Sequence, residues 1–198
     1  MAKRAFDLLL GCAALAFAAP FMLVIAAWIR LDSPGPVLFR QIRVGRFGRP
    51  FLIHKFRTMV ADAPERGPQV TAATDVRITR AGTWLRRSKL DELPQLFDVL
   101  AGHMSLVGPR PEVPQYVALY PDGLREKVLS VRPGITDPVS LKFADEGELL
   151  ARAADPEHEY TQVLLPAKLL EAAAYVDNAT VWTDLRLMGR TLRLLLAR

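Results

Sequence analysis

An uncharged apolar run from Leu8 to Ile29, LLLGCAALAFAAPFMLVIAAWI, constrains this chain more than any other feature of its sequence. The run has 22 residues, so as a helix it would be ~33 Å long and would match a hydrocarbon core of ~30 Å. A secretory signal peptide is the alternative, because Lys3 and Arg4 give a basic start. The run is long for a signal core, however, and AAW before Arg30 makes a poor cleavage site. We therefore expect a membrane segment.

Basic residues flank the apolar run on both sides. Lys3 and Arg4 precede it, and Arg30 opens a basic stretch after it, whereas cytoplasmic flanks are the ones that carry excess positive charge. Pro20 lies in the middle, where it removes one backbone hydrogen bond and bends or breaks a helix. Two arms meeting at Pro20 would each reach about half-way into a bilayer and form a re-entrant hairpin. On these residues alone, a straight span with a tolerated proline is equally open.

The remaining sequence predicts short strands followed by helices. VLF and PFLIHKF predict two strands, with RVGRFGR as the hairpin between them. The stretch up to Leu100 has helical spacing, with one face made by Leu90, Leu93, Leu96, Phe97 and Leu100. The helix should begin near Asp91, because Pro94 is best tolerated in a first turn. The expected fold class is α+β, mostly helical. Residues 1–32 would form the membrane hairpin and residues 33–198 a cytosolic, membrane-associated domain.

The closing stretch, VWTDLRLMGRTLRLLLAR, predicts an amphipathic helix. Its apolar positions at helical spacing are Trp182, Leu185, Met188, Leu192 and Leu195. The arginines interleaved with them are Arg186, Arg190, Arg193 and Arg198. This pattern suits a helix lying on an anionic membrane surface, and a terminal helix packed on the core is the equal alternative.

Charge is distributed unevenly along the chain. Residues 30–90 carry 13 Lys and Arg against four Asp and Glu, whereas residues 91–198 carry 11 against 16. The basic part indicates an anionic partner such as nucleic acid, anionic lipid or a phosphorylated substrate, and a merely soluble basic surface is the alternative. Nucleic acid is disfavoured, because few aromatic side chains lie among the basic residues to stack on bases.

The adjacent acids Asp91 and Glu92 are the strongest candidates for chemistry. The single cysteine, Cys12, excludes a disulfide framework, and the three histidines are not at metal-binding spacing. A carboxylate at the start of a helix can hold Mg²⁺ that also binds substrate phosphates, or can attack phosphorus itself. An ordinary helix cap with a first-turn acid is the commoner use of such residues.

Several basic residues near these acids suit phosphate recognition. Arg110 lies between two prolines in GPRPE, which holds its backbone extended and presents the guanidinium at low entropic cost. Arg86 precedes Asp91 by five positions. Lys55 and Arg57 would share one face of a strand in HKFRTM. For all of them, a solvated surface position is the alternative.

Together these motifs resemble one family, the bacterial sugar transferases that act as monotopic polyprenyl-phosphate phosphoglycosyl transferases. The resemblance covers nearly the whole chain. The blocks that carry it, in order, are KRAFDLLL, SPGPVLFRQIRVGRFGRPFLIHKFRTM, RITRAGTWLRRSKLDELPQLFDVLAGHMSLVGPRPE, RPGIT and VWTDLRLMGRTLRLLL.

The resemblance implies an activity and a location. Such enzymes move a sugar-1-phosphate from a UDP-sugar to a polyprenyl phosphate such as undecaprenyl phosphate, the first membrane step of surface glycan synthesis. They sit on the cytoplasmic face of the inner membrane through a re-entrant helix broken at a proline, here Pro20. The bilayer lipids are therefore partners as well, and a homo-oligomer is left open.

The resemblance also implies roles for particular residues. Asp91 would be the nucleophile on the β-phosphate, expelling UMP, and would hold the required Mg²⁺, with Glu92 as its catalytic partner. Arg86 and Arg110 match the phosphate-binding positions. The matching blocks offer further residues as substrate contacts or supports: Lys55, Arg57, Glu112 and Arg132. Lys3, Arg4 and Pro20 would set the membrane topology.

Three positions depart from the family's usual pattern. Ala19 stands where Ser often precedes the kink proline, and a Ser there could bond a freed carbonyl. Asp137 follows RPGIT where Gly is common, and His103 stands where an acid is common. The last two are expected to affect sugar choice or only local packing.

Overall fold

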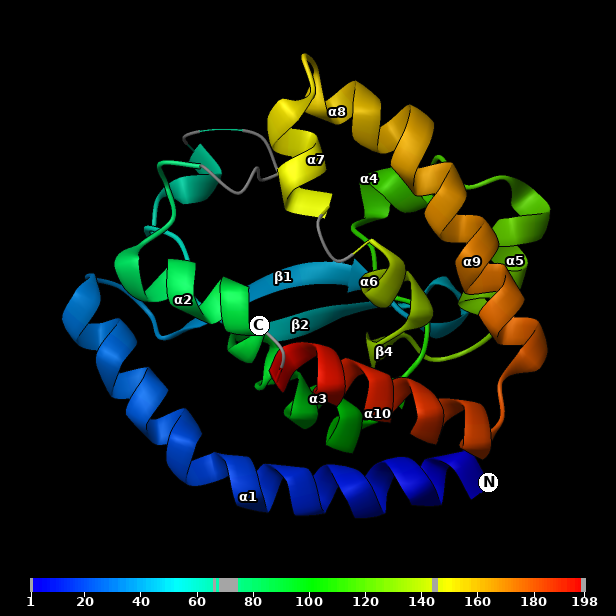
Figure 1. The fold of residues 1–198 in the computed structure, drawn as a ribbon, viewed down its shortest axis with the longest axis horizontal. Helices are drawn as coiled ribbons and strands as arrows, with labels where there is room; N and C mark the ends of the chain where they lie inside the picture. The colour runs from blue at the N-terminus through cyan, green and yellow to red at the C-terminus, as the bar shows by residue number, and fades with distance from the viewer. Residues whose placement is uncertain (1, 66, 68–74, 144–145, 197–198) are drawn as a thin grey trace.

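The computed structural model describes residues 2–65, 67, 75–143 and 146–196, and Figure 1 shows helices surrounding two small sheets. The predicted fold class, α+β and mostly helical, is confirmed. The helices are α1 (Ala2–Asp32), α2 (Arg80–Ser88), α3 (Gln95–Ala101), α4 (Pro114–Val117), α5 (Asp122–Leu129), α6 (Pro138–Lys142), α7 (Glu146–Arg152), α8 (Pro156–Glu159), α9 (Leu165–Asn178) and α10 (Val181–Leu196). The strands are β1 (Leu38–Val44), β2 (Pro50–Phe56), β3 (Ser105–Val107) and β4 (Gly134–Thr136).

The apolar run forms one continuous helix, α1, with Pro20 inside it. Figure 1 shows that α1 bends between two arms and curves round the rest of the chain. The bend is expected where Pro20 removes a backbone hydrogen bond, so the predicted interruption is a bend rather than a break in helical backbone. α1 is long and apolar enough to cross a membrane by length and composition.

The two faces of α1 differ in what they contact. The buried face carries Asp7, Gly11, Ala18, Met22, Ile25 and Ile29, at helical spacing along its whole length. This face packs mainly against α3, and also against α2 and β3. The opposite face exposes large apolar side chains that include Leu9, Phe17, Phe21, Leu23 and Val24. Such a continuous exposed apolar face is what a lipid environment would cover.

The predicted hairpin is present. β1 and β2 pair antiparallel, with Phe39 opposite Lys55 and Ile42 opposite Leu52. The second sheet is one that the sequence did not indicate, because RPGIT predicts only a turn-rich loop. There β3 pairs parallel to β4, with Ser105 opposite Gly134. A Cβ on Gly134 would lie 2.1 Å from the backbone nitrogen of Gly108, so glycine is required for this close approach.

The core consists of two clusters of apolar side chains. The first joins α1, the hairpin, α2, α3, β3 and α10, through residues that include Ile29, Phe56, Leu85, Val99 and Leu187. The second lies under α9, which packs against α5 and α6. Because α1 contributes to the first cluster, it is packed against the structure that carries the acids Asp91 and Glu92.

The closing helix α10 packs on the core by one side, which was one of the two predicted alternatives. Leu187 and Asp184 are buried where α10 packs against α6, β3 and β4. Of the predicted apolar stripe, Trp182, Leu185 and Leu192 are exposed and Met188 is half-buried. α10 is therefore attached to the core by one side and offers apolar side chains on another. Arg198 lies outside the described residues.

Candidate active site

The two acids lie in the turn that connects α2 to α3. α2 ends at Ser88, and Lys89 then adopts a left-handed conformation, with φ of 58°, which reverses the chain. Leu90–Glu92 form a single 3₁₀ turn, η3. Pro94 has no N–H to continue this turn, and α3 begins at Gln95, four residues after Asp91. Asp91 and Glu92 thus precede the helix instead of occupying its first turn.

Glu92 is held by two cations from different parts of the chain. Its Oε1 accepts hydrogen bonds from Lys55 Nζ on β2, at 2.7 Å, and from Arg110 Nη2 in the loop after β3, at 2.6 Å. Burial alone would raise the pKa of Glu92, but attraction to Arg110 and Lys55 and their hydrogen bonds lower it well below its usual range. Glu92 therefore stays ionised, and it fixes Lys55 and Arg110 in place.

Asp91 lacks a comparable clamp. Asp91 is 8% exposed, and its buried Oδ1 has no hydrogen-bond partner among the described residues. Burial, and after it the neighbouring charge of Glu92, raise the pKa of Asp91, although Lys55, Lys89 and Arg86 oppose the change. A buried carboxylate oxygen without a partner is costly, so its retention is typical of a functional group.

Arg86 is directed to the same region by the packing of α2. A Cβ on Gly82 would lie 1.9 Å from the carbonyl oxygen of Thr58, so only glycine lets α2 approach this closely. The Arg86 Nε atom then donates a hydrogen bond to Thr58 Oγ1 at 2.9 Å. Burial lowers the pKa of Arg86, and attraction to Asp91 opposes that change. Arg86 is thus a cation beside Asp91 whose guanidinium is not paired to Glu92.

The other predicted site residues bond elsewhere. Arg57 donates to the carbonyl oxygens of Ser33 and Pro34, just after α1, so it does not share a contact with Lys55. Arg132 donates through Nε to the Gly102 carbonyl at the end of α3, at 2.8 Å.

Glu112 and the two N-terminal cations also have partners within the fold. Glu112 accepts hydrogen bonds from Tyr160 and Arg43. Lys3 pairs with Asp184 on α10, and Arg4 donates to the carbonyl oxygens of Val99 and Leu100. These contacts support the fold around the site, whereas the dyad itself gathers Lys55, Arg86 and Arg110.

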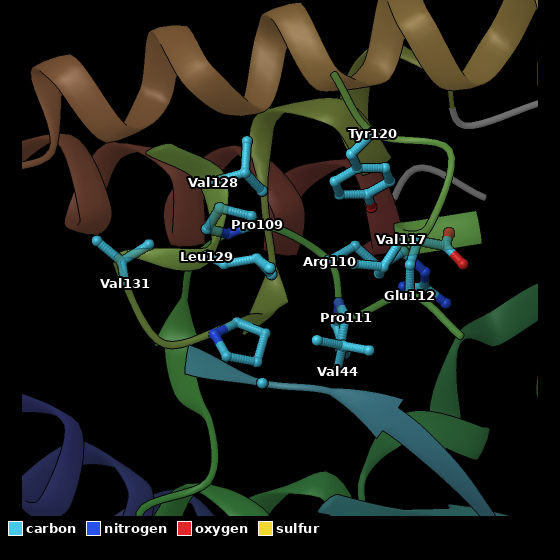
Figure 2. Close-up of a pocket in the computed structure, with 12 residues that line it drawn as sticks. Val44, Pro109, Arg110, Pro111, Glu112, Val117, Tyr120, Val128, Leu129 and Val131 are labelled. Carbon is cyan, nitrogen blue, oxygen red and sulfur yellow. The ribbon is translucent and has the colours of Figure 1, made fainter. Parts of the chain in front are cut away.

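A small cavity lies behind the loop that carries Arg110. Figure 2 shows Arg110 and Glu112 at this cavity, with Val128 and Tyr120 lining it as well. The lining of this cavity does not include Asp91 or Glu92. It is therefore not where the dyad would act, and the candidate site is defined by the side chains that surround Asp91.

Sequence periodicity misjudged the buried face of α3. We expected Leu90, Leu93, Leu96, Phe97 and Leu100 to share the core face, but Phe97 is exposed and Asp98 is buried. The reason is a polar contact: Asp98 accepts hydrogen bonds from both His54 N, at 2.9 Å, and His54 Nδ1, at 2.8 Å. This contact ties α3 to β2, the strand that carries Lys55.

Two of the departures from the family's pattern have structural uses. Asp137 caps α6, where its Oδ1 accepts from Ser140 N at 2.7 Å. The ring of His103 packs near that of Phe51, with the ring centres 5.7 Å apart. Asp137 therefore has a local capping role, and His103 has a local aromatic contact.

Comparison with known proteins identifies the family of this chain. The bacterial sugar transferase family matches residues 1–198. An Aeromonas hydrophila protein, UDP-N-acetylgalactosamine-undecaprenyl-phosphate N-acetylgalactosaminephosphotransferase, is 35% identical over 198 residues, which cover 98% of this chain and 43% of the relative. The undecaprenyl-phosphate glucose phosphotransferase of Komagataeibacter xylinus is 40% identical over 197 residues, covering 96% of this chain and 35% of that protein.

A third relative is closer in length. The UDP-glucose:undecaprenyl-phosphate glucose-1-phosphate transferase of Caulobacter vibrioides is 37% identical over 207 residues, covering 98% of this chain and 69% of the relative. The chain spans less than half the length of the first two relatives. Because the family match extends over residues 1–198, the chain belongs to the bacterial sugar transferase family.

Proposed function

We propose that this chain transfers a sugar-1-phosphate from a UDP-sugar to a polyprenyl phosphate and releases UMP. The observation that carries the proposal is the buried Asp91, which has an unpartnered carboxylate oxygen beside Glu92, Lys55, Arg86 and Arg110. The names of the relatives give undecaprenyl phosphate as their acceptor, and glucose or N-acetylgalactosamine as their sugar.

The first step uses Asp91 as the nucleophile. A carboxylate oxygen of Asp91 attacks the β-phosphorus of the UDP-sugar, and the bond from that phosphorus to the bridging oxygen breaks. UMP leaves with the electron pair, and a phosphosugar remains attached to Asp91 as an acyl phosphate. Arg86 and Arg110 would bind the phosphate oxygens, on which negative charge is concentrated throughout.

The second step takes place at the same carboxylate, which is now the leaving group. A phosphate oxygen of the polyprenyl phosphate attacks the phosphorus of the intermediate, and the bond to Asp91 breaks. Asp91 leaves as a carboxylate, ready for another turnover, and the product is a polyprenyl diphosphosugar. Glu92 would hold Lys55 and Arg110 in position during both steps, since it bonds both.

The residues present fit a Mg²⁺ ion. The unpartnered Oδ1 of Asp91 is the hard oxygen donor that Mg²⁺ prefers. The described residues contain no group of three or more His, Cys, Asp or Glu that could hold a metal, so substrate phosphates and water would complete the shell. When bound, the ion supplies positive charge that neutralises the phosphate oxygens.

A panel of UDP-sugars tests the proposal directly. The chain in lipid nanodiscs with undecaprenyl phosphate is expected to release UMP from at least one UDP-sugar, and to leave the others intact. Release of UMP from none of them, while the protein stays folded, would sink the proposed activity. Salt-sensitive binding of RNA or DNA without UDP-sugar binding would favour a nucleic-acid role instead.

A re-entrant topology on the cytoplasmic face of the inner membrane belongs to the same proposal. Ala2 is the first residue of α1 and Pro36 lies four residues after its end, and both are exposed. With Cys12 replaced by alanine, Ala2→Cys and Pro36→Cys should both react with a membrane-impermeant maleimide added from the cytoplasmic side, and neither from the other side. A straight span would expose one of the two on the far side and would contradict the hairpin.

The pH dependence should report the charge interaction within the dyad. The first step needs ionised Asp91, so kcat/KM should fall as pH drops through the raised pKa of Asp91. Glu92→Gln removes the neighbouring negative charge, which lowers the pKa of Asp91. The acidic limb of the kcat/KM profile should therefore move to lower pH in this variant. A limb that stays in place would show that Asp91 is not the titrating group.

A further inference from the structure

The apolar helix α1 carries a buried acid that the proposed chemistry does not use. Asp7 is 2% exposed, although it lies one residue before the apolar run. Its Oδ1 and Oδ2 accept from Ser105 Oγ at 3.0 and 2.9 Å, and Oδ1 also accepts from the backbone nitrogen of Leu106 at 3.2 Å. A carboxylate buried to this degree is retained only where its hydrogen bonds matter.

The partners of Asp7 lead directly to the candidate site. Ser105 and Leu106 open β3, and the chain runs from β3 through Gly108 into the loop that carries Arg110. Arg110 in turn reaches Glu92 at 2.6 Å. The hydrogen bonds of Asp7 therefore fix the start of the segment whose far end completes the dyad.

Other polar residues of α1 hold the remaining site segments. Arg4 donates to the carbonyl oxygens of Val99 at 2.7 Å and Leu100 at 3.1 Å, near the end of α3. Asp32 accepts from the backbone nitrogen of Ala81 at 3.1 Å, in the first turn of α2. α1 thus bonds α2, which carries Arg86, α3, which follows the dyad, and β3, which precedes Arg110.

We propose that Asp7 is a positioning residue for Arg110, and that the membrane helix is thereby part of the active-site scaffold. The proposal rests on the proposed function. Asp7 acts through hydrogen bonds to β3 and touches neither substrate nor the reacting atoms. Charge pairing with Lys3 is a weaker explanation of its burial, because that contact is 4.0 Å and Lys3 bonds Asp184 more closely.

Two substitutions at Asp7 separate hydrogen bonding from charge. Asp7→Asn keeps an acceptor for Leu106 N, and its amide can donate to Ser105 Oγ, whose single hydrogen is then free to reach the Val107 carbonyl at 2.9 Å. Asp7→Ala removes every one of these bonds. Ser105→Ala removes only the hydroxyl, so it keeps the test decisive should Asp7→Ala not fold. Asp122→Ala, at an exposed acid of α5, is the matched control.

The experiment measures UMP release and backbone hydrogen exchange on the full chain in nanodiscs. Asp7→Ala should lower kcat about tenfold or more with KM changed less than about threefold, since small misplacements of a catalytic group are costly. Hydrogen exchange in the peptide 104–112 should become faster. Asp7→Asn and Asp122→Ala should stay within about threefold of the parent protein, and Ser105→Ala should show a smaller loss than Asp7→Ala.

Three results would overturn the inference. These are an unchanged kcat in Asp7→Ala, an equal loss in Asp7→Asn, or a loss of kcat without faster exchange in 104–112. Should the parent protein release no UMP, the proposed function fails. The exchange measurement then still decides whether Asp7 holds β3.

Discussion

Replacing Asp91 with asparagine is expected to abolish UMP release, by at least about 10³-fold, because an amide cannot attack phosphorus as a carboxylate does. The variant should still insert into membranes, since within the described part of the chain Asp91 makes no hydrogen bond to α1. Asp122→Asn, at an exposed acid, is the matched control and should retain full turnover. Near-full turnover of Asp91→Asn would exclude Asp91 as the nucleophile.

The same substitution should not lower thermal stability. Because the folded-state pKa of Asp91 is raised, mainly by burial, its ionisation costs folding free energy at neutral pH. The contribution of Asp91 to the free energy of unfolding is therefore greatest in acid, and it is lost as pH rises through the raised pKa. Asp91→Asn removes the cost, so its Tm at pH 7–8 should equal or exceed that of the parent protein. The difference should shrink in acid, where Asp91 is protonated.

Replacing Arg110 with alanine is expected to have the second largest effect, a loss of about 10²–10³-fold in kcat, the usual cost of removing one donor to transition-state charge. Stability should fall too, because Glu92 remains buried with only Lys55 to pair it. That fall should be less than the about 3–5 kcal/mol typical of a fully broken buried pair. Arg110→Lys should restore only part of the turnover, because the lysine ammonium lacks the planar guanidinium that can form two parallel hydrogen bonds to a phosphate.

A double substitution separates the two effects of Arg110. Adding Glu92→Gln to Arg110→Ala removes the poorly paired negative charge, so Tm should recover while kcat stays low. Arg40→Ala, at an exposed arginine of β1, is the control and should change neither quantity. Turnover of Arg110→Ala within about threefold of the parent protein would show that Arg110 does not bind the phosphates.

Local patterns made α1, the hairpin and α10 predictable. The apolar run, the paired strand patterns around RVGRFGR and the spacing of Trp182 and Leu185 each depend on neighbours in sequence. Asp91, Glu92, Lys55 and Arg110 were each named as candidates from motif chemistry and resemblance together. A surface position was left open for Lys55 and Arg110, and their contacts with Glu92 were not predicted.

Contacts between distant residues were beyond prediction. Asp7 and Ser105 are separated by 98 positions, and nothing in either stretch marks the other as its partner. The three-residue strands β3 and β4 are too short to show a pattern. Phe97 was misplaced because periodicity does not show that Asp98 pairs with His54, a contact that places a polar side chain on the buried face of α3.

Basic residues of similar appearance proved to have different partners. Arg57 and Arg132 bond backbone carbonyl oxygens where α1 and α3 end, a use that sequence does not distinguish from phosphate binding. Lys55 and Arg110 instead meet the carboxylate of Glu92. Only the three-dimensional arrangement separates these two uses.

Mass spectrometry of the enzyme mixed with a UDP-sugar, in the absence of lipid acceptor, tests the central claim most directly. After a rapid quench, the peptide containing Asp91 should gain the mass of one sugar-1-phosphate less one water, with one UMP released per adduct. The adduct should vanish when polyprenyl phosphate is added, and should not form in Asp91→Asn. An adduct on another residue, or full turnover without any adduct, would contradict the assignment of Asp91.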